Sequence, residues 1–296
     1  TVQRAAVAIQ SKWKLSQLSC KRKGSSMNFT AEQIETYKTS GYLPGPRVLS
    51  DEQVDTLEKR IDDILEERVE FPKILKGEAS KKIKAKHLPS LKVVNLFRHD
   101  EVFARVWDNP AISSLAHDLM AGPVRLWEDQ MIYKPPFDAK AVLGWHQDYT
   151  FWSHVGPADM GTCWIALDDA TEENGCMYVI PGSHQWEISY SRDDMDTSDP
   201  DWLLKRPDIP AAADCTPVAC PVRAGHCHFH HCRLFHGSYG NKTDNARRTY
   251  ILHLMPGHTR RLGNNWNERM ASVEEVEIGQ IVQGVNYPEL PMPVEA

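Results

Sequence analysis

No apolar run in this chain approaches the roughly 18 residues that would cross a bilayer, and no C-x-x-C pair occurs among its seven cysteines. The first absence predicts a chain that does not span a membrane. The odd cysteine count without paired spacing does not resemble a disulfide framework. We therefore expect a reducing, intracellular environment, most simply the cytoplasm.

Acidic residues are missing from the N-terminal segment. Residues 1–31 carry six basic side chains and no Asp or Glu, so the formal net charge of −6 leaves the rest of the chain about twelve charges acidic. An acidic body argues against a nucleic-acid surface. We interpret residues 1–28 as a basic tail or leader and residues 29–296 as one domain. An organellar leader is one form that such a basic, acid-free segment can take.

Aromatic side chains, in contrast, are plentiful, with nine Trp, nine Tyr and eight Phe. At 41% apolar and 25% charged residues, the chain has an ordinary globular composition and enough apolar material for one substantial core. The aromatic residues also suffice to wall a dry pocket, which an enzyme with reactive intermediates needs.

Three segments carry helix signals. The runs Thr30-Ala31-Glu32-Gln33 and Ser50-Asp51-Glu52-Gln53 both fit the capping box, and apolar residues at helical spacing follow the second. Asn109-Pro110 predicts the start of a helix over about 110–121. We expect two N-terminal helices and a third before the β-rich part of the chain.

From about residue 124, short runs rich in aromatic and β-branched residues alternate with Pro, Gly and Asn, as in an antiparallel β unit. Strands are predicted at 126–133, 162–167, 176–180, 226–235 and 247–255. The Asn174-Gly175 pair predicts a tight hairpin between the second and third of these strands. Residues 187–215, dense in Asp, Ser and Pro, are interpreted as a long surface insertion, either disordered or a lid.

His146 and Asp148 are the most informative pair in the sequence. In an extended segment, residues two apart point to the same side, so this imidazole and this carboxylate can converge on one ion. His236, at the end of the His-rich run that begins at Gly225, supplies a third ligand. Two His and one carboxylate on one face of an octahedral ion leave three open positions, as in the non-haem Fe(II) oxygenases.

Arg247, eleven residues after His236, strengthens this interpretation. A 2-oxo diacid that chelates iron through one end leaves a second carboxylate at the other end. A guanidinium fork is the best bidentate partner for that carboxylate. A neighbouring antiparallel strand can deliver it.

These residues, together with Glu173-Asn174-Gly175-Cys176 and Pro181-Gly182-Ser183-His184, resemble the phytanoyl-CoA dioxygenase family of Fe(II)/2-oxoglutarate oxygenases over about residues 29–255. The resemblance implies a mainly β fold with flanking helices, a double-stranded β-helix (jelly roll, cupin-like). It implies Fe(II) held by His146, Asp148 and His236, with a salt bridge from Arg247 to the distal carboxylate of 2-oxoglutarate.

The resemblance also implies a reaction. With O2, such an enzyme hydroxylates a small organic substrate and releases succinate and CO2. Halogenating relatives have a small residue in place of Asp148, so the carboxylate at this position implies hydroxylation.

Further positions match the family by spacing. Ser238 resembles the hydroxyl that helps to bind the distal carboxylate, and Gln147 and Trp164 fall on cosubstrate positions. Lys92 and Tyr133 match by spacing alone; a core role for Trp164 and a solvated charge for Lys92 are the ordinary alternatives. Trp152 and His154, which follow the first ligands, are candidates for substrate contact.

Two other functions stay open at this stage, a non-catalytic metal-binding cupin-type module and a zinc-dependent hydrolase. A structural metal does not need Arg247 and Ser238, and a hydrolase would need a general base that no motif places. The further histidines 226, 228 and 230 share one strand face, where side chains diverge, so we interpret them as packed histidines rather than a second metal site.

The substrate itself is not encoded in a motif. The acidic balance disfavours a CoA phosphate site, while a lysine cluster keeps an acyl-CoA possible: Lys81, Lys82, Lys84 and Lys86. We expect a small-molecule substrate, with neither nucleic acid nor membrane as partner, and the oligomeric state is open.

Overall fold

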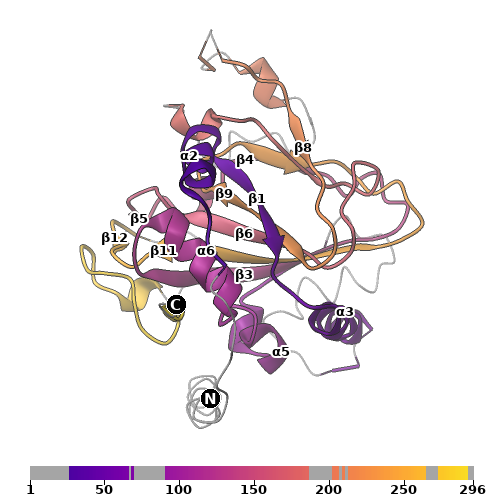
Figure 1. Ribbon diagram of the computed structural model, residues 1–296, viewed down its shortest axis with the longest axis horizontal. Coiled ribbons are helices and arrows are strands. Elements are labelled where there is room, and N and C mark those ends of the chain that lie inside the picture. The colour runs from indigo at the N-terminus through magenta and orange to yellow at the C-terminus, as the bar shows by residue number, and fades with distance from the viewer. Residues whose placement is uncertain are drawn as a thin grey trace.

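Two antiparallel β-sheets face one another in the computed structural model (Figure 1), which describes residues 27–66, 68–69, 91–186, 202–206, 209–210, 213–264 and 273–292. The larger sheet has the order β1 (Tyr42–Arg47), β9 (His226–His231), β6 (Gly161–Ala166), β11 (Arg247–Pro256), β3 (Val124–Lys134) and β2 (Leu91–Val94). The smaller sheet has the order β4 (Leu143–His146), β10 (His236–Ser238), β7 (Met177–Val179) and β8 (Val218–Cys220). The described strands form these two sheets and one separate two-stranded ladder rather than one closed barrel, and the mainly β, jelly-roll prediction is confirmed.

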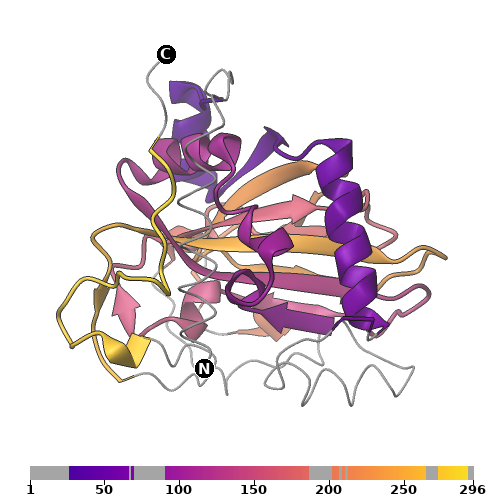
Figure 2. The ribbon, with the colours of Figure 1, turned by 90° about the horizontal axis from the view of Figure 1, so that it is seen from below.

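The three predicted helices are all present and cover the outer face of the larger sheet (Figure 2). They are α2 (Ala31–Ser40), α3 (Asp51–Leu65) and α6 (Pro110–Met120), with a short α5 (Glu101–Ala104) between the last two. Both capping boxes form as predicted, because Thr30 and Ser50 accept hydrogen bonds from the backbone N–H three residues on. Asn109 caps α6, which has Pro110 in its first turn.

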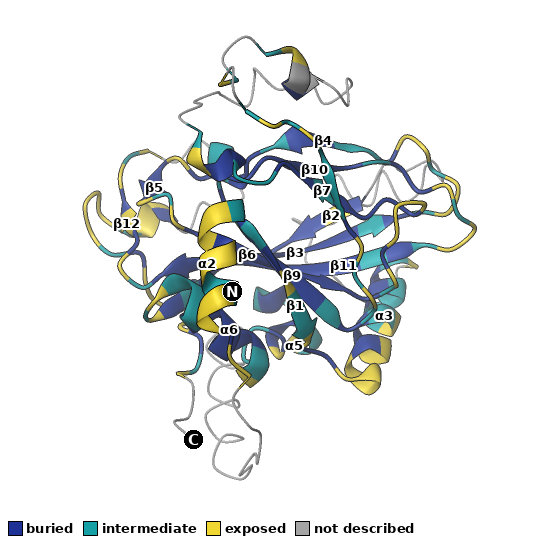
Figure 3. Ribbon diagram, turned by 45° about the horizontal axis from the view of Figure 1, so that its top comes forward, coloured by how far each residue is buried: buried dark blue, intermediate teal, exposed yellow. Residues whose placement is uncertain are grey.

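The central strands β6 and β11 of the larger sheet are almost entirely buried (Figure 3), and their period-two alternation separates the helix-covered core from an inner face. On β11, Tyr250 and Leu252 pack into the core beneath the helices, whereas Ile251 and His253 line a pocket between the sheets. On β6, Cys163 likewise packs outward and its neighbour Trp164 inward. The inner face of the larger sheet therefore carries every functional side chain that this sheet contributes.

The predicted hairpin between 162–167 and 176–180 is wrong. β6 pairs with β9 and β11 in the larger sheet, while β7 pairs with β10 and β8 in the smaller sheet. Asn174 does form a local turn, since its side chain accepts from Thr171 N–H and donates to the Asp169 carbonyl. Turn chemistry fixes a reversal of the chain, but here the reversal carries the chain from one sheet to the other.

The predicted strand 226–235 is also shorter than expected. β9 ends at His231, a turn closes with the Leu234 N–H donating to the His231 carbonyl, and β10 begins at His236. This break places His236 in the smaller sheet, opposite the histidines of β9. The predicted insertion 187–215 lies mostly outside the described residues, as does the basic segment 1–28 apart from its last two positions.

A C-terminal segment completes the described structure. A short ladder of β5 (Val155–Gly156) with β12 (Arg260–Arg261) and residues 273–292 pack around Trp127 and Trp152 in a second apolar cluster. Among the helices that the structure describes, none has the length and apolar character to cross a bilayer.

Candidate active site

Two neighbouring strands of the smaller sheet bring the three predicted metal ligands together. β4 and β10 are antiparallel, with His236 directly opposite His146, and Asp148 begins the 3-10 turn η3 (Asp148–Phe151) just after β4. The Nε2 atoms of His146 and His236 lie 3.7 and 3.6 Å from the same Asp148 oxygen, Oδ1. One ligand atom from each residue lies within 4.8 Å of the others.

The hydrogen bonds of both imidazoles leave Nε2 as the lone-pair nitrogen. His146 Nδ1 is 2.7 Å from the Gly144 carbonyl and His236 Nδ1 is 2.9 Å from the Leu234 carbonyl. Because a carbonyl only accepts, each Nδ1 carries the proton. Burial lowers the pKa of both rings, which keeps them neutral at pH 7.

This donor set fits a divalent metal. Two imidazole lone pairs and one carboxylate oxygen point toward the same place with no proton between them. These negative groups repel one another unless a cation lies between them. Two His and one carboxylate on one side, with a pocket on the other, form the facial geometry typical of non-haem iron.

The second oxygen of Asp148 is held by a separate set of contacts. Thr162 Oγ1 lies 3.0 Å from Asp148 Oδ2, and His230 Nε2 lies 3.3 Å from it. Thr162 Oγ1 is also 2.8 Å from His253 Nδ1. Since Thr162 has only one hydroxyl proton to donate to the carboxylate, His253 Nδ1–H donates to Thr162. A chain of donors from His253 through Thr162 thus orients Asp148.

These neighbours also determine the charge of the carboxyl. Burial alone would raise the pKa of Asp148, but the surrounding imidazoles, with His236 the strongest, hold it well below its usual range. Asp148 is therefore ionised and can act as a ligand at neutral pH.

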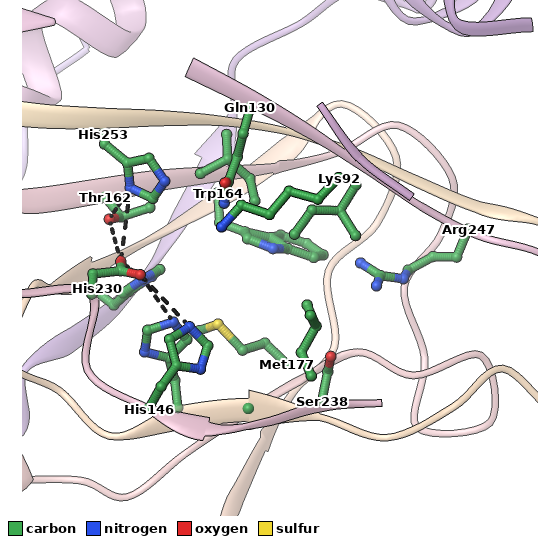
Figure 4. Close-up of a pocket in the computed structure, with 16 residues that line it drawn as sticks. Lys92, Gln130, His146, Thr162, Trp164, Met177, His230, Ser238, Arg247 and His253 are labelled. Atoms are coloured by element: carbon green, nitrogen blue, oxygen red, sulfur yellow. Dashed lines mark hydrogen bonds and ion pairs between the residues drawn. The ribbon is translucent and has the colours of Figure 1, made fainter. Parts of the chain in front are cut away.

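A pocket of about 510 Å³ opens beside the three ligands, between the two sheets (Figure 4). Apolar side chains from both sheets form its walls, namely Ile132, Leu143, Trp164, Met177 and Ile251. Near the three metal ligands the polar lining includes Thr162, His230 and His253, which surround Asp148. Elsewhere it consists of Lys92, Gln130, Ser238 and Arg247.

Arg247 lies at the end of this pocket away from the ligand cluster (Figure 4). Its side chain is 1% exposed, and Nε has no hydrogen-bond partner within the described residues. The guanidinium carbon lies 5.5 Å from the centre of the Trp164 ring, and Trp164 stacks in turn on His228. Burial lowers the pKa of Arg247 to about 10, so it remains a cation at neutral pH.

Four of the six predicted cosubstrate residues line the pocket: Arg247, Ser238, Trp164 and Lys92. Lys92 enters from edge strand β2 at the exposed rim, and Ser238 lies two residues after His236 on β10. The structure brings these side chains together with the ligands. Their part in cosubstrate binding remains a prediction.

The two others, Gln147 and Tyr133, point elsewhere, which corrects the expectation for both. Gln147 lies between two ligands that face the pocket and turns the opposite way, where its amide donates to the Arg233 carbonyl at 2.5 Å. Tyr133 lies between the inward Ile132 and Lys134 of β3 and packs against the helix-covered core. Spacing along the chain matched the family, but side-chain parity excludes both from the pocket.

Trp152 and His154, the predicted substrate contacts, also do not line the pocket. Trp152 is 2% exposed and packs edge-on against Trp127 in the second apolar cluster. His154 lies beside the same Trp127, and burial lowers its pKa to about 4. Their close packing makes them part of a core that supports the site from behind.

Sequence reasoning missed several functional side chains. Thr162, His230 and His253 surround Asp148, and Gln130 and Lys134 share the inner face of β3. The alternation of side chains along a strand could have predicted them, because residues separated by an even number of positions lie on the same face. Each of these residues is separated in this way from another inward-facing residue of its strand. His228 and His230 are buried and lie side by side, and His230 also contacts Asp148. Among the described residues, one cluster has metal-ligand geometry. That residues 226, 228 and 230 form no second metal site stays a prediction.

Comparisons with known proteins agree with this geometry. The family model for phytanoyl-CoA dioxygenase (PhyH) matches residues 37–249. An L-proline trans-4-hydroxylase from Streptomyces griseoviridis is 37% identical over 150 residues, which cover 50% of this chain and 52% of the relative. Phytanoyl-CoA dioxygenase domain-containing protein 1 from Mus musculus is 34% identical over 162 residues, which cover 54% of this chain and 55% of the relative. The chain thus matches about half the length of these two relatives.

A solved structure extends the likeness over nearly the whole chain. The non-heme alpha ketoglutarate dependent carbocyclase SnoK from nogalamycin biosynthesis superposes with a TM-score of 0.66 and 25% identity. The match covers 90% of this chain and 100% of that one. The fold of this chain is therefore shared over the full length of that SnoK chain.

Proposed function

This chain belongs to the phytanoyl-CoA dioxygenase family, and we propose that it is an Fe(II)- and 2-oxoglutarate-dependent dioxygenase that hydroxylates a small organic substrate. One observation carries the proposal. One end of the pocket holds the cluster of two His and one carboxylate. The other end holds the buried Arg247, whose Nε has no hydrogen-bond partner within the described residues. That pair of features fits a metal chelator with a distal carboxylate.

His146, Asp148 and His236 would hold the metal, which when bound supplies the redox chemistry by which O2, 2-oxoglutarate and the substrate give succinate, CO2 and the hydroxylated substrate. The hydrogen bonds from Nδ1 to backbone carbonyls fix the orientation of both imidazole rings, so that the Nε2 lone pairs point toward the metal position before the metal binds. Thr162 and His230 keep one Asp148 oxygen occupied, which leaves the other for the metal.

Arg247 would bind the distal carboxylate of 2-oxoglutarate with its planar fork. Trp164 lies against the guanidinium and restricts its orientation. The aliphatic walls of the pocket, Ile132 and Ile251 among them, exclude water from the reacting groups. Each of these contributions is binding, orientation or solvent exclusion by the protein.

Neither alternative function explains both ends of the pocket. A non-catalytic metal site has no use for a buried guanidinium in the same cavity. A zinc hydrolase needs a general base near the open metal positions. Among the described pocket residues, the only carboxylate is Asp148, which is already a ligand.

The relatives support hydroxylation as the outcome and a free metabolite as the substrate class. One of the matched relatives is a hydroxylase of L-proline, and the mainly apolar walls of the pocket with few polar side chains suit a small metabolite. The lysine cluster that kept acyl-CoA open lies outside the described residues. That the protein acts inside the cell stays a prediction from the odd, unpaired cysteine pattern of the sequence.

The test is turnover of 2-oxoglutarate by the Fe(II)-loaded protein in the presence of a metabolite panel. We expect His146→Ala and Asp148→Ala to lose succinate formation, because each removes one of three ligands. His258→Ala is the matched control, since its side chain is 62% exposed and lies apart from the site. Succinate formation at the normal rate by either ligand variant would refute the proposal.

A further inference from the structure

Two buried basic side chains lie near the end of the pocket away from the metal ligands, Arg247 in its lining and Lys134 behind it. Arg247 is 1% exposed and Lys134, on the neighbouring strand β3, is fully buried. Within the described residues, neither has a carboxylate within ion-pair distance. A fully buried lysine without an acidic partner is costly when charged. Its presence at this position requires an explanation that the metal and Arg247 do not provide.

The contacts of Lys134 connect it to the cosubstrate site through one hydroxyl. Its Nζ donates to Ser238 Oγ at 2.8 Å and also to the Tyr239 carbonyl. Ser238 lines the pocket, whereas Lys134 lies behind it. Because Ser238 accepts from the amine, its own hydroxyl proton is available to an acceptor in the pocket.

The packing leaves the amine little freedom to move. A Cβ added at Gly175 would lie 3.1 Å from Lys134 Nζ, and Gly175 has a φ of +82°, which favours glycine. The Asn174-Gly175 turn therefore closes over the amine and holds it against Ser238. A neutral amine has two N–H donors, and the two acceptors named above use both of them.

We propose that Lys134 is a positioning residue for the cosubstrate, one that directs the Ser238 hydroxyl into the pocket and takes up a proton when a dicarboxylate binds there. This inference rests on the proposed function. In the binding step, one proton moves from solvent to the Lys134 nitrogen, one N–H bond forms, and no bond in the dicarboxylate changes.

The electrostatics around Lys134 support this coupling. Burial first, and then the nearby Arg247, lower the pKa of Lys134 to about 6. The other groups that face it are Cys176 before β7 and Asp138 after β3, together with the hydroxyl and the carbonyl after β10. A bound carboxylate stabilises the ammonium form and raises this pKa. Affinity for 2-oxoglutarate should therefore fall as the pH rises above about 6.

Isothermal titration of 2-oxoglutarate into the Mn(II)-loaded protein tests the inference without turnover. At pH 7, an amine with an unliganded pKa of about 6 is about nine-tenths deprotonated, so the wild type should take up as much as roughly 0.9 proton per ligand, measured in two buffers of different ionisation enthalpy. Lys134→Met should take up almost none and bind about 10-fold more weakly. Ser238→Ala should also bind more weakly but keep the proton uptake, because Lys134 remains.

Circular dichroism and thermal melting show whether the Lys134→Met protein folds. If it does not, Lys134→Arg provides the test, because arginine stays positively charged across this pH range. It should bind 2-oxoglutarate without proton uptake. Proton uptake equal to that of the wild type in either Lys134 variant would overturn the inference, as would a wild type that binds without uptake. A wild type that does not bind 2-oxoglutarate at all would overturn the proposed function as well, whereas binding and turnover without uptake overturn only the role of Lys134.

Discussion

Thr162→Val tests whether the contacts behind Asp148 govern metal binding. The substitution preserves the shape of the side chain and removes one hydroxyl, which is fully buried and joins Asp148 Oδ2 at 3.0 Å to His253 Nδ1 at 2.8 Å. After the change, Asp148 Oδ2 keeps two longer contacts, 3.3 Å to His230 Nε2 and 3.7 Å to His253 Nδ1. The Nδ1–H of His253 loses its acceptor.

The magnitude follows from the two lost hydrogen bonds. A hydrogen bond to an ionised group contributes about 1.5–3 kcal/mol, and a buried donor left without an acceptor costs about 1–3 kcal/mol. Because the two bonds share one hydroxyl, we expect their loss to lower the free energy of unfolding by about 3 kcal/mol rather than by the full sum. Metal affinity should fall about 10–100-fold, as for other groups that orient a ligand.

Metal affinity is measured by competition with a chromogenic chelator, and the free energy of unfolding by urea denaturation with and without metal. Thr259→Val is the matched control, because Thr259 is equally buried and its hydroxyl has no hydrogen-bond partner within the described residues. This control should leave metal affinity unchanged and should not destabilise the fold. An unchanged metal affinity in a folded Thr162→Val protein would show that Asp148 does not depend on this network.

Three further outcomes are expected. Arg247→Ala should raise the KM for 2-oxoglutarate about 100-fold, since a buried charged partner is lost, while metal affinity measured by chelator competition stays the same. Burial raises the pKa of Asp129 to about 7, above its unfolded value of 3.8; the stability that this carboxyl contributes is therefore complete at low pH and declines as the pH rises, by about 3 kcal/mol between pH 5 and 8. Asp129→Asn should remove that decline in urea denaturation at the two pH values, and an unaltered pH dependence would contradict the assignment. Gly175→Ala should lower stability by about 1–3 kcal/mol because of its positive φ and should weaken 2-oxoglutarate binding by displacing Lys134; normal binding would refute the packing argument.

Local signals in the sequence predicted the parts of the fold that depend on neighbours along the chain. The capping residues Thr30 and Ser50 and the Asn109-Pro110 pair placed all three main helices, because capping involves atoms within three or four residues. The Asn174-Gly175 turn was found for the same reason. Its partner strands were not, since pairing depends on β9 and β11, which are distant in sequence.

The same division holds within the site. The spacing of His146 and Asp148, with His236 and Arg247 later in the chain, predicted a metal centre and a distal carboxylate partner once the resemblance to a known family was added, because H-x-D spacing alone recurs by chance. The tertiary structure decided which neighbours face the pocket. It turned Gln147 and Tyr133 away.

The structure also placed Thr162 behind Asp148 and Lys134 behind Ser238. Side-chain direction follows from strand parity and from where a strand breaks, and the break after His231 depends on packing between two sheets. Functions that depend on the type and spacing of individual residues could therefore be predicted from the sequence. Chemistry that arises from contacts between distant strands was determined only by the folded chain.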